Sequence, residues 1–394
     1  MNSSSLFGKE ENILKNAKAS LESKGDLTAD FKTLLKGYEK LFKQTRRLVR
    51  LSDRQQLRLN SLNESLELRN RFITGVFGRY LSDDIVEELL QTPGGLQLGG
   101  EKRRMTILMS DLRGFTALAE KLPADQVLQI LNHYLEEMTE IIFKHQGTID
   151  EILGDGLLVI FGVPTTREDD ATRAIACAID MQIAMERVNR WNQKHGFPEL
   201  KLGVGLHTGD VIVGNIGSTK RTKYGVVGRE VNLTARIESY TVGDQILISK
   251  AARDACLVPL AIRSQSEVFP KGCSGSIQIL DVEGIQGGPG LPANREVLTE
   301  LSVPVPVQYR VLTGKDVNSE EQEGVIVACA KSQVAIVQSE KSPPFTNVKI
   351  SYREHEIYGK VIKQKEENQD DRSLVVLTSL PADVQAFMRA LNKP

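Results

Sequence analysis

The sequence predicts an α+β protein in which a central domain with a split βαβ sheet follows a long helix and precedes a small β-barrel. Three observations support this class: a proline-free stretch with a heptad-like apolar stripe near the N-terminus, alternating strand and helix patterns in the middle, and short β-type runs after a Gly- and Pro-rich segment. The 394 residues, 40% of them hydrophobic, are enough for two or three domains with real cores.

The charge and cysteine content narrow the class of protein. Lysine plus arginine number 50 and aspartate plus glutamate 51, and the net charge of −1 gives no electrostatic basis for a nucleic-acid or membrane-surface partner. The four cysteines form no C-x-x-C pair, which is typical of reduced thiols. No apolar run approaches the roughly 18 residues of a membrane span, and the start Met-Asn-Ser-Ser-Ser lacks the apolar core of a signal peptide. We therefore expect a soluble, cytoplasmic protein.

The N-terminal 100 residues divide into three segments. Residues 1–30 are polar and are expected to be flexible. Residues 31–70 predict a dimeric coiled coil, because their apolar residues alternate in steps of three and four; these are Leu34, Tyr38, Leu41, Leu48, Leu59, Leu62 and Leu66. Polar residues interrupt the stripe, so the alternative is one amphipathic helix packed on its own domain. Residues 71–100 are predicted to be a helical transducing connector, with a short helix at 83–90 and a Gly-rich end.

Residues 101–285 are predicted to form one domain with alternating strands and helices. In order, we expect a strand at Met105–Ser110, a helix at Pro123–His145, strands at Thr148–Leu153 and Leu157–Phe161, a helix from a Thr166/Asp169 capping box to about His195, a strand at Leu200–Gly217 and a helix at Glu230–Tyr240. The first six elements follow the order of a ferredoxin-like split βαβ fold with an antiparallel hairpin in its middle.

Two aspartates stand at strand ends in this predicted domain. Asp111 follows the first strand, and Asp155 lies in the turn of the hairpin. In a split βαβ sheet the first strand lies beside that hairpin, so the two carboxylates can converge. Hard carboxylate oxygens near a Gly-containing loop are suitable ligands for Mg²⁺ with a triphosphate. Each aspartate also has a plainer explanation, because Asp111 could cap the next helix and Asp155 could serve only as a turn former.

Four long sequence strings carry a resemblance to a known family. They are LGGEKRRMTILMSDLRGFT (98–116), GTIDEILGDG (147–156), HTGDVIVGNIG (207–217) and GVVGREVNLTARIE (225–238). In this order they resemble the class III adenylate/guanylate cyclase catalytic domain, over roughly residues 100–285. The resemblance implies a nucleotide cyclase, which is a phosphorus–oxygen lyase.

The resemblance also assigns roles to particular residues. Asp111 and Asp155, with Leu112, would hold two divalent ions, Mg²⁺ or Mn²⁺. Leu112 and the backbone of Gly114, Phe115 and Thr116 would hold the substrate phosphates at the start of a helix. These assignments predict a phosphate and metal site at the end of the first strand.

A second group of predicted site residues lies on the helix near residue 230. Asn232 and Arg236 are four residues apart, so both point to one side of that helix. The resemblance implies that Asn232 positions the ribose and that Arg236 stabilises charge on the α-phosphate in the transition state. The alternative for Asn232 and Arg236, without the flanking motif, is an ordinary Asn–Arg pair on a solvated helix face. Lys271 falls where the family often has a triphosphate-binding lysine, and its alternative is a plain turn lysine.

Two further positions indicate guanine rather than adenine. The family reads its purine four residues before the second metal aspartate and seven residues before the ribose-positioning Asn, and here these residues are Glu151 and Gly225. An ionised glutamate only accepts hydrogen bonds, so Glu151 can accept from both N1–H and the 2-amino group of guanine. Adenylate cyclases usually have Lys and Asp or Thr at these positions, and Gly225 removes a carboxylate that would face guanine O6.

The C-terminal region is predicted to be a separate module. Residues 286–302 read as a linker, and residues 303–394 as a small β-barrel with a last helix at Ala382–Leu391. The ends of this region weakly resemble a PilZ-type domain. Arg310 has no second arginine four residues away, so we expect a structural or protein-contact module rather than a cyclic dinucleotide sensor.

The combined prediction is a guanylate cyclase that converts GTP to 3′,5′-cyclic GMP in a homodimer with shared active sites. A regulatory protein would act through the coiled coil or the C-terminal domain. The first alternative is an adenylate cyclase that uses ATP. The second belongs to another class, a catalytically silent scaffold that dimerises and binds nucleotide.

Overall fold

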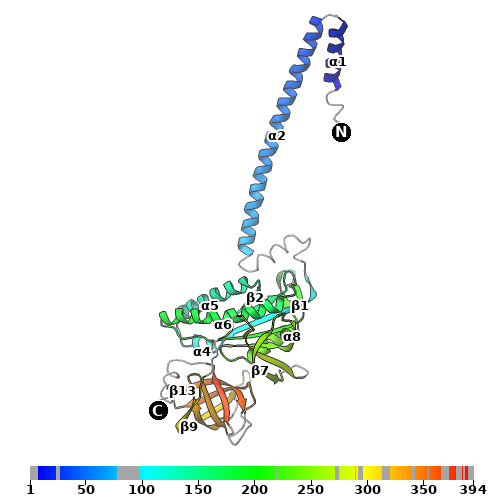
Figure 1. Cartoon of the computed structure of the whole chain (residues 1–394). Helices are drawn as coiled ribbons and strands as arrows, with labels where there is room; N and C mark the ends of the chain where they lie inside the picture. The colour runs from blue at the N-terminus through cyan, green and yellow to red at the C-terminus, as the bar shows by residue number, and fades with distance from the viewer. Residues whose placement is uncertain are drawn as a thin grey trace. The chain divides into compact units, whose positions relative to one another are not determined.

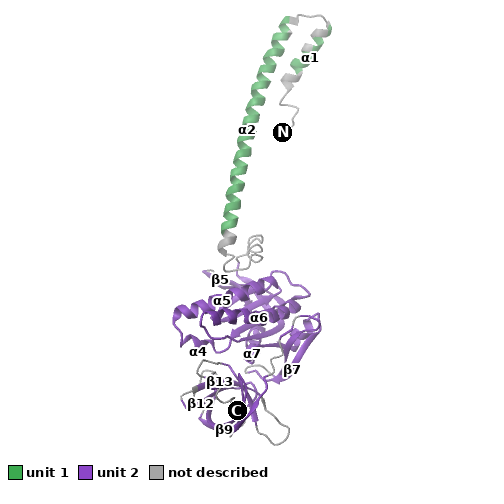
Figure 2. Cartoon of the chain, turned by 60° about the vertical axis from the view of Figure 1, so that its left-hand side comes forward, with its two compact units in different colours: residues 1–80 green, residues 81–394 purple. Residues whose placement is uncertain are grey.

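The computed structural model of the chain describes most of its residues. The described residues are 8–23, 27–77, 97–218, 220–270, 275–288, 290–291, 296–312, 320–338, 342–353, 355–364, 372–378, 384 and 387–388. They fall into two compact units, residues 1–80 and residues 81–394 (Figure 2). The helix expected at 83–90 lies outside the described residues.

The first unit consists of two helices. Helix α1 (Gly8–Ser23) lies in the segment that we expected to be flexible, and more than half of that segment is therefore helical in the structure. Helix α2 (Leu27–Phe77) is 51 residues long and extends beyond the predicted coiled-coil segment at both ends. The side chain of Ile13 on α1 lies against Gly37 of α2, where a Cβ atom would be 3.4 Å away, an ordinary van der Waals distance.

The apolar stripe of α2 is exposed in the single chain. Leu59, Leu62 and Leu66 are 54%, 51% and 56% exposed, and Leu48 and Tyr38 are exposed as well. Apolar side chains at this spacing favour packing against a second helix. No described helix has the length and apolar character that a membrane-spanning segment requires.

The second unit contains an eight-stranded sheet with strand order β2-β3-β1-β4-β6-β8-β7, and β5 pairs with β4. Its strands are β1 (Gly99–Leu112), β2 (Thr148–Leu153), β3 (Gly156–Phe161), β4 (Leu202–Ser218), β5 (Arg221–Val227), β6 (Gln245–Ser249), β7 (Leu260–Val268) and β8 (Ile277–Ile285). Its helices are α4 (Phe115–Ala119), α5 (Ala124–Lys144), α6 (Asp170–Lys194), α7 (Arg229–Ser239) and α8 (Lys250–Ala255). The order β2-β3-β1-β4 confirms the predicted ferredoxin-like sheet.

The predicted capping box of α6 was wrong in its details. The helix begins at Asp170, and the Asp169 side chain makes no capping hydrogen bond. Thr166 instead donates its hydroxyl to Gly162 O, and Arg167 N donates to Asp170 Oδ2. The carboxylate that receives a backbone N–H thus belongs to the first helical residue, one position later than expected.

Helices α5 and α6 lie side by side over one face of the sheet (Figure 1). Their buried apolar residues form the main core together with Leu202, Val204 and Leu206, all on one side of β4. Because side chains alternate along a strand, the residues between them face the opposite side of the sheet.

That opposite side of β4 carries a row of glycines beneath helix α7. A Cβ atom on Gly203 would lie 2.0 Å from Thr241 Oγ1, one on Gly205 would lie 2.4 Å from Glu238 N, and one on Gly209 would lie 2.8 Å from Glu230 Cγ. His207 in the same row is hydrogen-bonded to Glu230 of α7 at 2.8 Å. Only glycine lets the helix backbone come this close to the strand.

Residues beyond 298 form a closed barrel with strand order β10-β11-β14-β13-β12-β9, as expected. Its strands are β9 (Thr299–Leu312), β10 (Gln322–Cys329), β11 (Gln333–Gln338), β12 (Asn347–Tyr352), β13 (His355–Gln364) and β14 (Arg372–Leu377). The expected last helix lies mostly outside the described residues, but Val384, Phe387 and Met388 are helical and pack against the barrel core.

Substituting Gly205 by alanine tests the close approach of α7 to β4. The added methyl group would meet backbone atoms of Glu238, so we expect a loss of about 1–3 kcal/mol in the free energy of unfolding. This loss should lower the melting temperature of the domain by several degrees, measured by calorimetry. Gly209→Ala is the matched control, because its methyl group meets a side chain first and should cost less. Equal stability of Gly205→Ala and the unmodified chain would contradict the proposed packing.

Candidate active site

Two aspartates meet at one end of the sheet. Asp111 is near the end of β1, and Asp155 lies in the turn between β2 and β3. Strand β1 pairs with β3, with Ser110 opposite Leu157, so the turn lies beside the end of β1. Leu112 N donates to Asp155 Oδ2 at 3.2 Å. The structure therefore brings together the two carboxylates that the sequence singled out.

Asp111 does not cap the following helix. The N-cap residue of α4 is Gly114, in the left-handed region with φ 71°. The side chains of Leu112 and Phe115 are buried in the main core. At these two positions only the backbone is available to a ligand, whereas the side chain of Thr116 is exposed.

The charge of Asp155 has no compensating ion pair among the described residues. Burial and then the neighbouring Asp111 raise the pKa of Asp155 to about 6. Among the described residues, no group of three or more His, Cys, Asp and Glu could hold a metal ion. Two repelling carboxylates without further protein ligands fit a divalent cation such as Mg²⁺, which usually shares one or two carboxylates with substrate phosphates.

Arg113 links this carboxylate pair to helix α7, and the sequence reasoning missed it. Its guanidinium lies 2.9 Å from Asp111 Oδ2 and also pairs with Glu238 of α7. The Arg113 side chain is only 11% exposed. Its place two residues after Asp111 was a usable signal, but its second partner is 125 residues away in the sequence.

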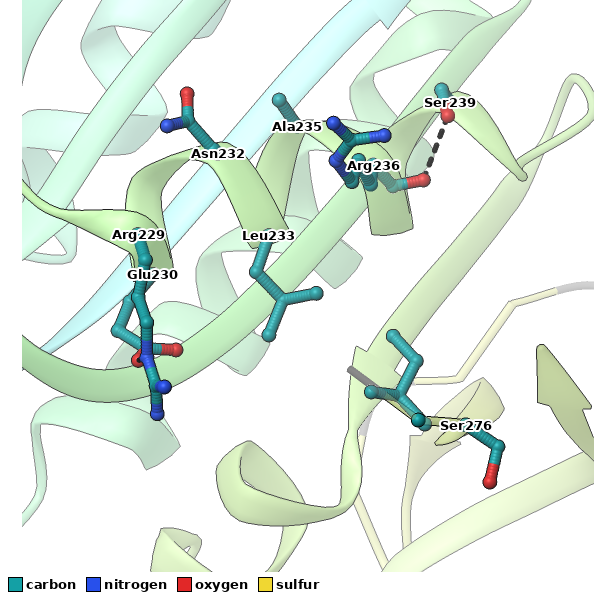
Figure 3. Close-up of a pocket in the computed structure, with 10 residues that line it drawn as sticks. Arg229, Glu230, Asn232, Leu233, Ala235, Arg236, Ser239 and Ser276 are labelled. Carbon is teal, nitrogen blue, oxygen red and sulfur yellow. Dashed lines mark hydrogen bonds and ion pairs between the residues drawn. The ribbon is translucent and has the colours of Figure 1, made fainter. Parts of the chain in front are cut away.

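Asn232 and Arg236 lie one turn apart on α7 and line a cavity of ≈ 610 Å³ (Figure 3). The other lining residues are Arg229, Glu230, Leu233, Ala235, Ser239, Gly275, Ser276 and Ile277. In the described part of the chain Arg236 makes no ion pair, so its charge is available to an anion. No hydrogen bond or ion pair between described residues joins Asn232 or Arg236 to the two aspartates. Lys271 lies outside the described residues.

Glu151 on β2 and Gly225 on β5 lie near each other. Two further charged residues, Asp150 and Lys223, lie beside them. Lys223 Nζ lies 2.9 Å from Glu151 Oε2 and 3.1 Å from Asp150 Oδ2. Partial burial opposes the charge of Lys223, but the hydrogen bonds and charges of Glu151 and Asp150 outweigh burial and raise its pKa. Neither Lys223 nor Asp150 was among the predicted site residues.

Asp150 explains why residue 225 is a glycine. The Asp150 side chain is only 4% exposed, and a Cβ atom on Gly225 would lie 2.6 Å from its Oδ1. Burial raises the pKa of Asp150, while Lys223 acts in the opposite direction. A side chain at 225 would have to displace the Asp150 carboxylate, so the protein's own packing favours glycine here, whichever base binds.

Comparison with known proteins places this site in a family. Residues 100–278 match the adenylate and guanylate cyclase catalytic domain. The chain is 30% identical over 238 residues to an adenylate cyclase of Anabaena cylindrica, covering 58% of this chain and 45% of that protein. It is 26% identical over 232 residues to adenylate cyclase 1 of Rhizobium meliloti, covering 58% of this chain and 34% of that protein. The chain thus spans less than half the length of these curated relatives.

Two solved structures are also similar. The chain is 49% identical to the guanylyl cyclase Cya2, with 50% of this chain and 98% of that chain covered and a TM-score of 0.47. It is 35% identical to the adenylyl cyclase CyaB from P. aeruginosa, with 47% and 96% covered and a TM-score of 0.45. One of these two similar structures is a guanylyl cyclase and the other an adenylyl cyclase.

Asp155→Asn tests the carboxylate pair without measuring activity. A raised pKa means that Asp155 contributes stability below about pH 4, which is lost as the pH rises through about 6. Without divalent cations, the variant should therefore be more stable than the unmodified chain at pH 8, by ~1–2 kcal/mol after allowance for screening. Added Mg²⁺ or Mn²⁺ should raise the melting temperature of the unmodified chain but not of the variant.

The exposed Asp254 on α8 provides the control, since Asp254→Asn removes the same charge away from the pair. Its response to pH and to divalent cations should match that of the unmodified chain. A cation response retained in Asp155→Asn would show that Asp155 is not a ligand.

Proposed function

This chain belongs to the adenylate and guanylate cyclase family through residues 100–278, and we propose that it is a guanylate cyclase. It would convert GTP to 3′,5′-cyclic GMP and pyrophosphate. In this reaction the 3′-oxygen attacks the α-phosphorus, the bond to the β-phosphate oxygen breaks, and the proton of the 3′-hydroxyl is lost. The observation that carries the choice of GTP is the charged group around Glu151.

The two aspartates define where the triphosphate would bind. Asp111 and Asp155 would each share a divalent cation with phosphate oxygens, and the backbone N–H groups of residues 114–116 would donate to the phosphates. The divalent cations would supply positive charge that acidifies the 3′-hydroxyl and neutralises the leaving pyrophosphate. The raised pKa of Asp155 favours binding of positive charge at this point.

Helix α7 would supply the groups that act on the sugar and the α-phosphate. Arg236 has no ion pair among the described residues, so its guanidinium can face charge that develops on the α-phosphate. Asn232, one turn earlier on the same side of the cavity, would hold the ribose by hydrogen bonds. A donor or cation fixed in this way typically contributes about 10²–10³ in rate.

Glu151 and Lys223 would read the guanine edge. The Glu151 carboxylate would accept from N1–H and from the 2-amino group, and the adjacent Lys223 ammonium would donate to O6. Their side chains are already within 2.9 Å of one another, so an acceptor and a donor stand next to each other as guanine requires. Adenine has an acceptor at N1, which would face the Glu151 carboxylate without a proton between them.

The active sites would be formed by two chains. Within the described part of the single chain, no hydrogen bond or ion pair joins Asn232 or Arg236 to Asp111 or Asp155. The apolar stripe of α2 is exposed. A two-fold homodimer can bring α7 of one chain to the aspartates of the other, and it then builds two equivalent sites. The stripe of α2 would hold the two chains together as a coiled coil.

The substrate is tested by chromatography of the products from GTP and from ATP, with Mg²⁺ and with Mn²⁺. We expect cyclic GMP, with kcat/KM for GTP at least roughly tenfold above that for ATP, because two hydrogen-bond acceptors, the Glu151 carboxylate and adenine N1, facing each other in the occupied site cost about 1–3 kcal/mol. Glu151→Lys should abolish most GTP turnover, whereas Glu186→Lys on the exposed face of α6 should not. Preference of the unmodified chain for ATP would refute the guanine assignment.

An exchange of specificity needs a third substitution. Glu151→Lys with Gly225→Asp restores the residues that usually recognise adenine, but a side chain at 225 would meet Asp150. We therefore expect measurable ATP turnover from the two substitutions combined with Asp150→Ala, and less without it. Kinetics of the two variants with both nucleotides would measure this. Equal ATP turnover with and without Asp150→Ala would contradict the packing explanation for Gly225.

Mixed dimers test whether the sites are shared. Asp111→Ala and Arg236→Ala should each be inactive alone. After co-expression in equal amounts, roughly half of the dimers are mixed, and each has one intact site, so about a quarter of normal activity should return. Co-expression is required because a coiled coil at α2 would slow subunit exchange. No recovery in proven mixed dimers would mean that each chain carries a complete site.

A further inference from the structure

Lys360 is a buried lysine that points out of the barrel. On β13 the side chains of Ile357 and Val361 lie in the barrel core, so Lys360 faces the other way. It is nevertheless only 2% exposed. Its Nζ donates to Ser239 O and, at 2.8 Å, to Thr241 O, both at the C-terminal end of α7. The residue thus joins the barrel to the helix that carries Asn232 and Arg236.

The end of α7 is a site where a cation has a physical use. The last carbonyl groups of a helix have no intrahelical donor, and the helix dipole places partial negative charge there. Burial of an ammonium group is costly, and burial, with Arg113 acting in the same direction and Asp111 against it, lowers the pKa of Lys360 to about 7. A methionine would fill this space without that cost, so barrel stability alone does not account for a lysine here.

Phe345 makes a second contact from the same part of the barrel. Its backbone N–H donates to Val361 O at 2.6 Å, next to Lys360. Its ring meets Tyr240 edge-on, with the ring centroids 5.4 Å apart, and packs on the apolar cluster beneath α7 that includes Ile237 and Leu247. Phe345 has a left-handed backbone with φ 65°, a costly conformation for a phenylalanine that its surroundings must hold in place.

We propose that Lys360, assisted by Phe345, is a positioning residue for the cyclase reaction: the barrel holds the C-terminal end of α7 and thereby the placement of Asn232 and Arg236. This proposal rests on the function proposed above. The same end of the helix carries Glu238, which pairs with Arg113. The barrel therefore contacts a helix whose C-terminal end is already linked to Asp111 through Glu238 and Arg113. One side of the same helix lines the cavity. An error of about 1 Å in such a group can cost roughly a hundredfold in rate.

The test uses the full chain with Lys360→Met, which keeps the apolar stem and removes the ammonium group. We expect kcat to fall by about fivefold or more while KM for the nucleotide changes less than twofold, because the Arg236 contact develops in the transition state. Lys360→Arg keeps a cation and should restore much of kcat. Lys349→Met is the matched control, since Lys349 pairs with Glu356 within the barrel.

Hydrogen exchange provides a readout that does not require turnover. The amides at the end of α7, residues 237–241, should exchange faster in Lys360→Met and in Phe345→Leu than in the unmodified chain or in Lys349→Met. Faster exchange without any cyclase activity in the unmodified chain would refute the proposed function but keep the contact. Normal kcat with normal exchange in Lys360→Met, or a fall in melting temperature with unchanged kcat, would overturn the positioning role.

Discussion

The close approach of α7 to β4 is the constraint on which the rest of the site depends. The helix backbone at Glu238 lies where a side chain from Gly205 would otherwise stand, and the side chain of Thr241, just beyond the helix, occupies that place at Gly203. A helix seated on a strand in this way has little freedom to rotate or slide, because protein interiors are closely packed. Asn232 and Arg236 therefore extend from a helix whose position is fixed. Glu238 extends from the same helix, and its carboxylate pairs with Arg113.

One short helix thus has three kinds of contact. Its side lines the cavity with Asn232 and Arg236, its C-terminal turn reaches Asp111 through Glu238 and Arg113, and its last carbonyls receive Lys360 of the barrel. In a dimer with shared sites, the helix would serve the partner's aspartates while it is tied to its own. A change at the C-terminal end of α7 would then affect both active sites of the dimer, by direct contacts and without a large movement.

The charged side chains of the site suit a ligand that carries charged groups of its own. The carboxylates of Asp111 and Asp155 repel each other, and Arg236 makes no ion pair in the described part of the chain. Such groups lower the stability of the protein alone, since buried or crowded charges are costly without partners. Near the base site the balance differs, because Lys223 already holds Asp150 and Glu151. At the phosphate end Asp155 and Arg236 make no ion pair with any described residue, whereas the base end is paired in advance.

The sequence by itself determined the order of the secondary-structure elements and the meeting of the two candidate metal-binding carboxylates. The helix at α5, the β2–β3 hairpin and the meeting of Asp111 with Asp155 were predicted, because periodicity and turn residues act over a few neighbouring positions. Helix α1 was missed, since its polar residues give no clear stripe. The partners of Arg113, the position of Asp150 under Gly225 and the contact of Lys360 with α7 were decided only by the tertiary structure. Those contacts join residues far apart in the chain, and strand order and helix packing, which local pattern does not encode, bring them together.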